Sequence, residues 1–113
     1  MYNVDTDSKL HELINKSHEQ PVVLFKHSTR CPISTNANEE MSLVVKDFAQ
    51  GSIQFGLIYV VEHREVSLLA ANELGIKHES PQVLVLQDGK VIWHDSHYGI
   101  RYDKLEPILS QFS

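Results

Sequence analysis

The segment Val22–His27 reads Val-Val-Leu-Phe-Lys-His and runs directly toward Cys31. Its first four residues are apolar on both faces, as in a central strand of a parallel sheet that is covered on both sides. After Cys31-Pro32, apolar residues recur at helical spacing, at Ala37, Met41, Val44, Val45 and Phe48. A buried strand followed at once by an amphipathic helix predicts an α/β fold.

The alternation of helix and strand continues along the chain. Apolar spacing predicts a first helix over residues 8–18 and another over residues 66–74, ended by Gly75. A second buried strand is expected at residues 53–61, and residues 1–4 could add a short edge strand. Strand followed by helix thus occurs twice, which is the pattern of a parallel arrangement.

The last third of the chain has a different pattern. Strands are expected at residues 82–87 and 90–94, on either side of Asp88-Gly89, a dipeptide that favours a type I′ hairpin turn. A final helix should reach Phe112, with Asp103 and Glu106 as a capping box and Pro107 at the end of its first turn. The expected fold is α/β with a mixed central sheet, parallel in its first half and ending in an antiparallel hairpin, flanked by helices.

Length and charge exclude several classes of protein. With 113 residues and 42% hydrophobic content, the chain is expected to form a single domain over residues 1–113. No apolar stretch approaches the ~20 residues of a membrane span, so no membrane association and a cytoplasmic location are expected. Ten Lys and Arg against fifteen Asp and Glu give a net charge of -5, the wrong sign for a nucleic-acid binder.

The cysteine count restricts the chemistry further. Cys31 is the only cysteine, so the chain can form no internal disulfide and no mechanism can use two of its own thiols. Any disulfide that Cys31 forms must be with another molecule. The seven histidines show no HxxxH spacing, and no metal site is expected.

Cys31 is the candidate nucleophile. It lies where a strand ends and a helix begins, where free amides and the helix dipole stabilise an anion and lower the pKa of a thiol. Pro32 suits the first helical position and leaves the amides of Ile33 and Ser34 free to point at the sulfur, while Arg30 adds a positive charge. The alternative is a small buried hydrophobic residue. Since a low pKa chiefly speeds departure of the thiol, the pattern suggests a carrier that is loaded and unloaded.

Two further features lie near the expected site. Ser34 gives C-x-x-S where a dithiol oxidoreductase has C-x-x-C, and a serine cannot resolve a disulfide. Its hydroxyl or backbone could donate to the thiolate, or Ser34 could be an ordinary residue of the first helical turn. Ser80-Pro81 directly precedes the strand at residues 82–87, where by itself it indicates only a turn.

Taken together, these features resemble the thioredoxin fold over nearly the whole chain. The segment Cys31-Pro32-Ile33-Ser34, with Ser28-Thr29 before it and His78-Glu79-Ser80-Pro81-Gln82 downstream, more specifically resembles the monothiol bacilliredoxins. The similarity extends to Trp93-His94 and Ser96-His97. The family often has Thr directly before the cysteine, whereas here it is Arg30, a difference that could alter thiol acidity or substrate choice.

The resemblance implies a monothiol thiol-disulfide oxidoreductase that removes bacillithiol from S-bacillithiolated proteins by transfer to Cys31. It implies a cis Ser80-Pro81 bond across the cleft from Cys31. The implied catalytic residues are Cys31 and Ser34, and the substrate-binding residues are Arg30, Pro32, Ile33, Ser80 and Pro81. Bacillithiol is the co-substrate, no cofactor is tightly bound, and another redoxin or a bacillithiol disulfide reductase would recycle the protein. Further possible ligand contacts are Lys77, His78, His97 and Arg101.

Two other functions remain open at the level of sequence. A monothiol protein of this fold could carry an iron–sulfur cluster between two subunits through Cys31 and small thiols. The chain could also be a non-catalytic interaction module in which Cys31 is incidental.

Overall fold

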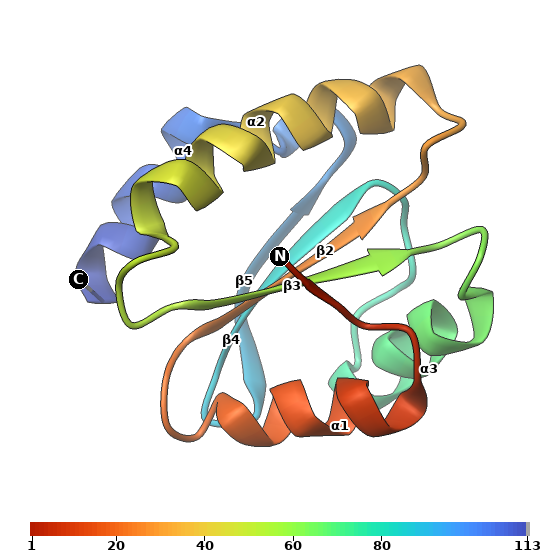
Figure 1. Ribbon diagram of the computed structural model, residues 1–113, viewed down its shortest axis with the longest axis horizontal. Coiled ribbons are helices and arrows are strands. Elements are labelled where there is room, and N and C mark those ends of the chain that lie inside the picture. The colour runs from red at the N-terminus through yellow and green to blue at the C-terminus, as the bar shows by residue number, and fades with distance from the viewer. Residues whose placement is uncertain (113) are drawn as a thin grey trace.

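The computed structural model describes residues 1–112 and contains a five-stranded sheet between two pairs of helices (Figure 1). The strands are β1 (Tyr2–Asn3), β2 (Val22–His27), β3 (Gln54–Tyr59), β4 (Gln82–Gln87) and β5 (Lys90–Ser96), in the spatial order β1-β3-β2-β4-β5. Strands β1, β3 and β2 are parallel, β4 is antiparallel to β2, and β5 is antiparallel to β4. The predicted mixed sheet is therefore confirmed, with β3 shorter than expected and β5 two residues longer.

Helices cover both faces of this sheet (Figure 1). Helices α1 (Asp7–Lys16) and α3 (Arg64–Leu74) lie on one face, and α2 (Pro32–Phe48) and α4 (Tyr102–Leu109) lie on the other. Two short 3-10 turns, η1 (His97–Gly99) and η2 (Ser110–Phe112), precede and follow α4. All six residues of β2 are buried, as expected for a central strand with a hydrophobic layer on each side.

The hairpin turn between β4 and β5 has the predicted geometry. Asp88 and Gly89 have φ values of 54° and 77°, and a type I′ turn requires positive φ at both central residues. The backbone N–H groups of the two residues donate to the carbonyl oxygen and the Oγ of Ser17, each at 2.8 Å. These bonds fix the hairpin against the end of α1.

Helix α4 begins differently from the prediction. Its N-cap is Arg101, so Asp103 is not the capping residue and the predicted capping box is wrong. The free N–H of Tyr102 instead donates to Oε1 of Glu40 in α2 at 2.8 Å, while Asp103 pairs with Arg101. A carboxylate from the neighbouring helix thus accepts a hydrogen bond from a backbone N–H of the first turn that has no partner within its own helix. Pro107 lies beyond the first turn, inside the helix.

Gly56 in β3 allows α1 to pack closely on the sheet. A Cβ atom at this position would lie 2.5 Å from Cδ1 of Leu13 and 3.0 Å from Cδ2 of Leu24. Both neighbours are fully or almost fully buried and belong to the layer beneath α1 and α3. The absence of a side chain is therefore a packing requirement at this point.

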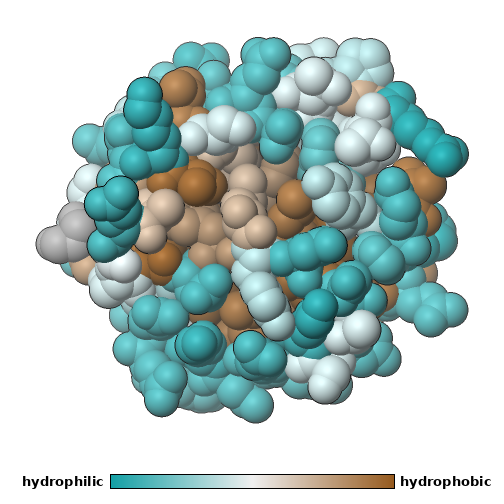
Figure 2. Space-filling view, in the orientation of Figure 1, coloured by the Kyte–Doolittle hydropathy of each residue, from teal (hydrophilic) through white to brown (hydrophobic). Residues whose placement is uncertain are grey.

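The molecular surface is mixed. Figure 2 shows apolar residues in the middle of the face that it presents, with hydrophilic residues around them. Exposed apolar side chains also occur singly on several elements, for example Leu43 on α2 and Ile92 on β5. Within residues 1–112, no helix has the length and apolar character needed to cross a membrane.

Candidate functional site

Three chain segments emerge at one end of the sheet. Lys26, near the end of β2, pairs with Gln82 at the start of β4, and Gln82 pairs in turn with Ser96 at the end of β5. The segment after β2 carries Cys31, the segment before β4 carries Ser80-Pro81, and the segment after β5 is η1. The topology therefore brings the predicted cysteine and proline segments to the same end of the molecule.

Cys31 lies at the predicted junction between strand and helix. It is a free thiol of intermediate exposure and the N-cap of α2, with φ -116° and ψ 123°. Pro32 occupies the first turn, and the backbone N–H of Thr35 donates to the carbonyl oxygen of Cys31 at 3.0 Å. The side chain of Cys31 accepts no capping hydrogen bond, so the expected contacts from the amides of Ile33 and Ser34 to the sulfur are not formed.

Ser34 faces the sheet. Its Oγ lies 2.6 Å from Nδ1 of His27 and accepts a hydrogen bond from the backbone N–H of Ser28 at 2.9 Å. Ser34 is fully buried, and His27 is only 6% exposed. The expected donation from the Ser34 hydroxyl to the thiolate is thus replaced by contacts with the end of β2, where this buried hydroxyl has two polar partners.

The other residues around Cys31 are more open to solvent. Arg30 and Pro32 are exposed, and Ile33 is half-buried. The backbone N–H of Arg30 donates to Oγ of Ser28 at 3.3 Å, and Arg30 is exposed to solvent, where a ligand could meet it. This placement is compatible with the predicted binding roles of the three residues and leaves those roles as predictions.

The bond between Ser80 and Pro81 is cis, as the resemblance implied. Pro81 is buried, and its carbonyl oxygen accepts a hydrogen bond from the backbone N–H of His97 at 3.0 Å. The Oγ of Ser80 is buried and has no hydrogen-bond partner among residues 1–112. The segment before β4 is therefore held from the side of β5 and η1.

Lys26 and His78 form a second polar cluster on the opposite face of β2 from His27. The ammonium of Lys26 is fully buried and donates to the carbonyl oxygen of Ser67 at 3.0 Å and to Nδ1 of His78 at 3.1 Å. Burial lowers the pKa of Lys26 from 10.5 to about 8. Burial also lowers the pKa of His78, and the positive charge of Lys26 lowers it further. His78 is thus engaged with the interior of the protein.

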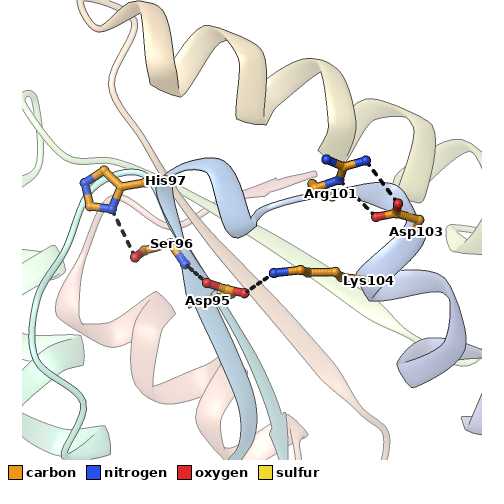
Figure 3. A network of polar contacts seen from close by, with 6 residues as sticks. All are labelled: Asp95, Ser96, His97, Arg101, Asp103 and Lys104. Carbon is orange, nitrogen blue, oxygen red and sulfur yellow. Dashed lines mark hydrogen bonds and ion pairs between the residues drawn. The ribbon is translucent and has the colours of Figure 1, made fainter.

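The remaining predicted ligand contacts are dispersed. Arg101 makes two hydrogen bonds to the carboxylate of Asp103, each at 3.1 Å (Figure 3). His97 is the first residue of η1, directly after β5, and its Nδ1 lies 3.0 Å from Oγ of Ser96 (Figure 3). The same Nδ1 lies 4.0 Å from Oε2 of Glu79. Lys77 is exposed. Of these residues, His97 is the one whose backbone contacts the cis-proline segment directly.

His27 and Lys26 also belong to this end of the sheet, although neither was predicted from the sequence as part of the site. The available signal was the placement of two polar, titratable residues at the end of an otherwise apolar buried strand. Buried polar groups need hydrogen-bond partners, so Lys26 and His27 had to meet polar groups from neighbouring elements. Within residues 1–112, no three His, Cys, Asp or Glu side chains converge in a way that could hold a metal ion.

Comparison with known proteins supports this architecture. Residues 2–105 match the protein family described as monothiol bacilliredoxin BrxC. Among solved structures, a candidate oxidoreductase with a thioredoxin fold superposes with a TM-score of 0.83 and 24% identity, over 94% of this chain and 90% of that chain. Thioredoxin from Fasciola hepatica gives a TM-score of 0.77 and 18% identity over 100% of both chains. Thioredoxin from Malassezia sympodialis gives a TM-score of 0.76 and 16% identity, over 99% of this chain and 90% of that chain. The thioredoxin-like fold is confirmed.

Proposed function

Because the chain belongs to the monothiol bacilliredoxin family, we propose that it removes bacillithiol from S-bacillithiolated proteins by thiol–disulfide exchange at Cys31. The family and the fold support a thiol-disulfide oxidoreductase. The observation that carries the finer proposal is the state of Cys31, which is the chain's only cysteine, free and partly exposed at the start of α2.

The proposed reaction has two exchange steps. In the first, the thiolate of Cys31 attacks the bacillithiol sulfur of the mixed disulfide, and the substrate protein leaves as a thiolate that takes up a proton. Cys31 then carries bacillithiol in a disulfide. In the second step, the thiolate of an external thiol attacks that bacillithiol sulfur, and Cys31 departs as a thiolate. One sulfur atom suffices for both steps, in agreement with the presence of Ser34 at the position of a second cysteine.

Substrate is proposed to dock along the end of the sheet where Cys31 and Ser80-Pro81 lie. The backbone of Ser80 would pair with an extended segment of the substrate protein, as in other strand-addition complexes. Bacillithiol carries the carboxylates of a malate group, so the exposed guanidinium of Arg30 is its proposed partner beside the sulfur. Pro32 and Ile33 would supply contacts from the first turn of α2.

The proposed reaction also has a co-substrate, a recycling system and a cellular location. Bacillithiol is the co-substrate, and no tightly bound cofactor takes part. Bacillithiol itself or another redoxin would unload Cys31, and a bacillithiol disulfide reductase would return the released disulfide to the thiol form. The proposed location is the cytoplasm, where small thiols are kept reduced.

The direct test is to incubate the protein with an S-bacillithiolated substrate protein and follow both intact masses. Transfer predicts that the mass of one bacillithiol disappears from the substrate and appears on this chain. A glutathionylated form of the same substrate serves as the control for thiol preference. No transfer from either substrate would reject the reductase. Visible absorbance of the purified protein would then favour an iron–sulfur carrier, and slow alkylation of Cys31 without colour would favour an interaction module.

A further inference from the structure

The hydrogen bonds of Ser34 enclose the loop that carries Cys31. Ser34 lies in the first turn of α2, and both of its polar partners, His27 and Ser28, lie where β2 ends. Residues 29–33 connect these two anchor points. The loop bearing the thiol is therefore closed at its base by two hydrogen bonds that converge on one hydroxyl group.

We propose that His27 is a positioning residue of the thiol site, which accepts a hydrogen bond from the Ser34 hydroxyl through Nδ1 and so holds the Cys31 loop in place. The proposal rests on Cys31 being a reactive thiol, whatever the identity of the small thiol that it carries. His27 acts through Ser34 and makes no contact with the sulfur in this role.

The donor and acceptor roles follow from the valence of the hydroxyl group. The Oγ of Ser34 accepts from the N–H of Ser28, which leaves its single hydrogen to be placed. Ser34 is fully buried, and among residues 1–112 the one other polar atom bonded to its Oγ is Nδ1 of His27 at 2.6 Å. If Nδ1 carried a hydrogen, the hydroxyl hydrogen would be buried without this acceptor, which is costly. The structure therefore assigns the neutral tautomer of His27, with its proton on Nε2.

The surroundings of His27 favour this neutral form. Its ring stacks on Phe25 with a centroid distance of 5.4 Å and lies 6.1 Å from the ring of Tyr59 in β3. Burial lowers the pKa of His27, and the carboxylate of Glu62, after β3, acts in the opposite direction. The titratable groups of the loop that these hydrogen bonds close, residues 29–33, are Arg30 and Cys31. At neutral pH, His27 is thus ready to accept, and acidification removes that capacity.

Three variants separate positioning from packing. His27→Phe keeps an aromatic ring against Phe25 and removes the acceptor, whereas His27→Asn keeps an acceptor near the place of Nδ1 and cannot titrate. Ser34→Ala removes the hydroxyl group that donates to Nδ1 of His27. His94→Asn on β5, an exposed histidine outside this cluster, is the matched control.

The readout is the rate at which Cys31 reacts with dithiodipyridine, a small symmetrical disulfide that any reactive thiolate attacks. This probe keeps the test independent of bacillithiol, so failure of the proposed function and failure of this inference are distinguishable. At about pH 7.5, His27→Phe should slow the reaction about three- to ten-fold, the effect of losing one hydrogen bond, and His27→Asn should stay within about two-fold of the wild type. His94→Asn should have no effect.

Three further measurements address the mechanism. In the Ser34→Ala background, His27→Phe should cause no additional loss of rate, because both changes remove the same bond. Because burial lowers the pKa of His27 below 6.5, the ratio of the wild-type rate to the His27→Asn rate should be constant above about pH 7. At lower pH this ratio should fall as His27 takes up a proton and can no longer accept the hydrogen bond. Nitrogen-15 NMR of the ring should show an unprotonated Nδ1 at about pH 7.5.

Several results would overturn the inference. Additive effects of His27→Phe and Ser34→Ala would show that His27 acts independently of the hydroxyl. A protonated Nδ1 in the neutral ring would reverse the assigned hydrogen bond. Identical pH profiles for the wild type and His27→Asn would remove the link between His27 protonation and thiol reactivity. If His27→Phe does not fold, the NMR measurement and the comparison of His27→Asn with the wild type still decide the question.

Discussion

The Nδ1 atom of His27 lies 2.6 Å from Oγ of Ser34, across the loop that carries the only cysteine. Because of this contact, the hydroxyl of the C-x-x-S serine faces the end of β2 and not the sulfur of Cys31. Ser34 occupies the position of a second cysteine, yet its hydroxyl is bound to the end of β2. The hydroxyl of the fourth residue of the motif is thus bound within the protein, and in the proposed reaction Cys31 supplies the reacting atom.

Replacing Cys31 by Ala should abolish all transfer of bacillithiol, because the variant has no sulfur that could form the mixed disulfide. The fold should persist, since Cys31 is only partly buried and its side chain makes no capping bond. Intact-mass kinetics measure the transfer, and circular dichroism checks the fold. Residual transfer by a folded Cys31→Ala protein would place the nucleophile elsewhere.

Ser34→Ala should lower the free energy of unfolding by about 1–3 kcal/mol, because the buried N–H of Ser28 and Nδ1 of His27 each lose a partner. The first transfer should remain possible, with a rate changed about ten-fold or less. Urea denaturation measures the stability. Ser42→Ala is the control in the same helix, since the Ser42 hydroxyl is exposed and donates to the carbonyl oxygen of Asn38 in its own helix. Equal losses in the two variants would contradict the buried role of Ser34.

The stability of the protein should rise with pH between about 8 and 10.5, owing to Lys26. Its pKa in the folded protein is about 8, below the 10.5 of the unfolded chain, so in this window the unfolded chain holds a proton that the folded protein has lost. The gain attributable to Lys26 is on the order of 3 kcal/mol at most. Lys26→Met should lack this part of the pH dependence. Parallel stability curves for the variant and the wild type in urea denaturation would refute it.

Gly56→Ala should destabilise the fold by about 1–3 kcal/mol, because the added methyl group would meet Leu13 and Leu24 in the packed layer beneath α1. Gly51→Ala is the matched control, since Gly51 is exposed and its nearest neighbour would be 3.5 Å away. Thermal unfolding measures both variants. A melting temperature lowered equally in the two would show that Gly56 is not a packing constraint.

The sequence predicted the elements whose signals are local. The apolar run of β2 and the Asp88-Gly89 turn were found because their residue types admit few other conformations. The start of α4 was missed because Glu40, more than sixty residues away in sequence, satisfies the N–H of Tyr102. A contact of this kind leaves no periodic trace in the chain.

The same distinction applies to the site. The position of Cys31 at a strand-to-helix junction followed from local pattern, and the cis bond before Pro81 followed from the family resemblance. The partners of Ser34 and Lys26 depend on how β2 packs against α2 and against the segments around Ser67 and His78. Residue types alone indicated that such buried polar groups would need partners, but only the packing identifies which.

In the proposed reaction, one sulfur atom, that of Cys31, carries the small thiol. The most direct measurement is to trap the reaction of this protein with a bacillithiolated substrate at successive times and to locate the added mass by fragmentation. We expect one bacillithiol per chain, attached to Cys31 and appearing at the rate at which the substrate loses it, and no internally oxidised form. A bacillithiol attached to any other residue, or its loss from the substrate without the transient appearance of the Cys31 adduct, would show that Cys31 is not the carrier.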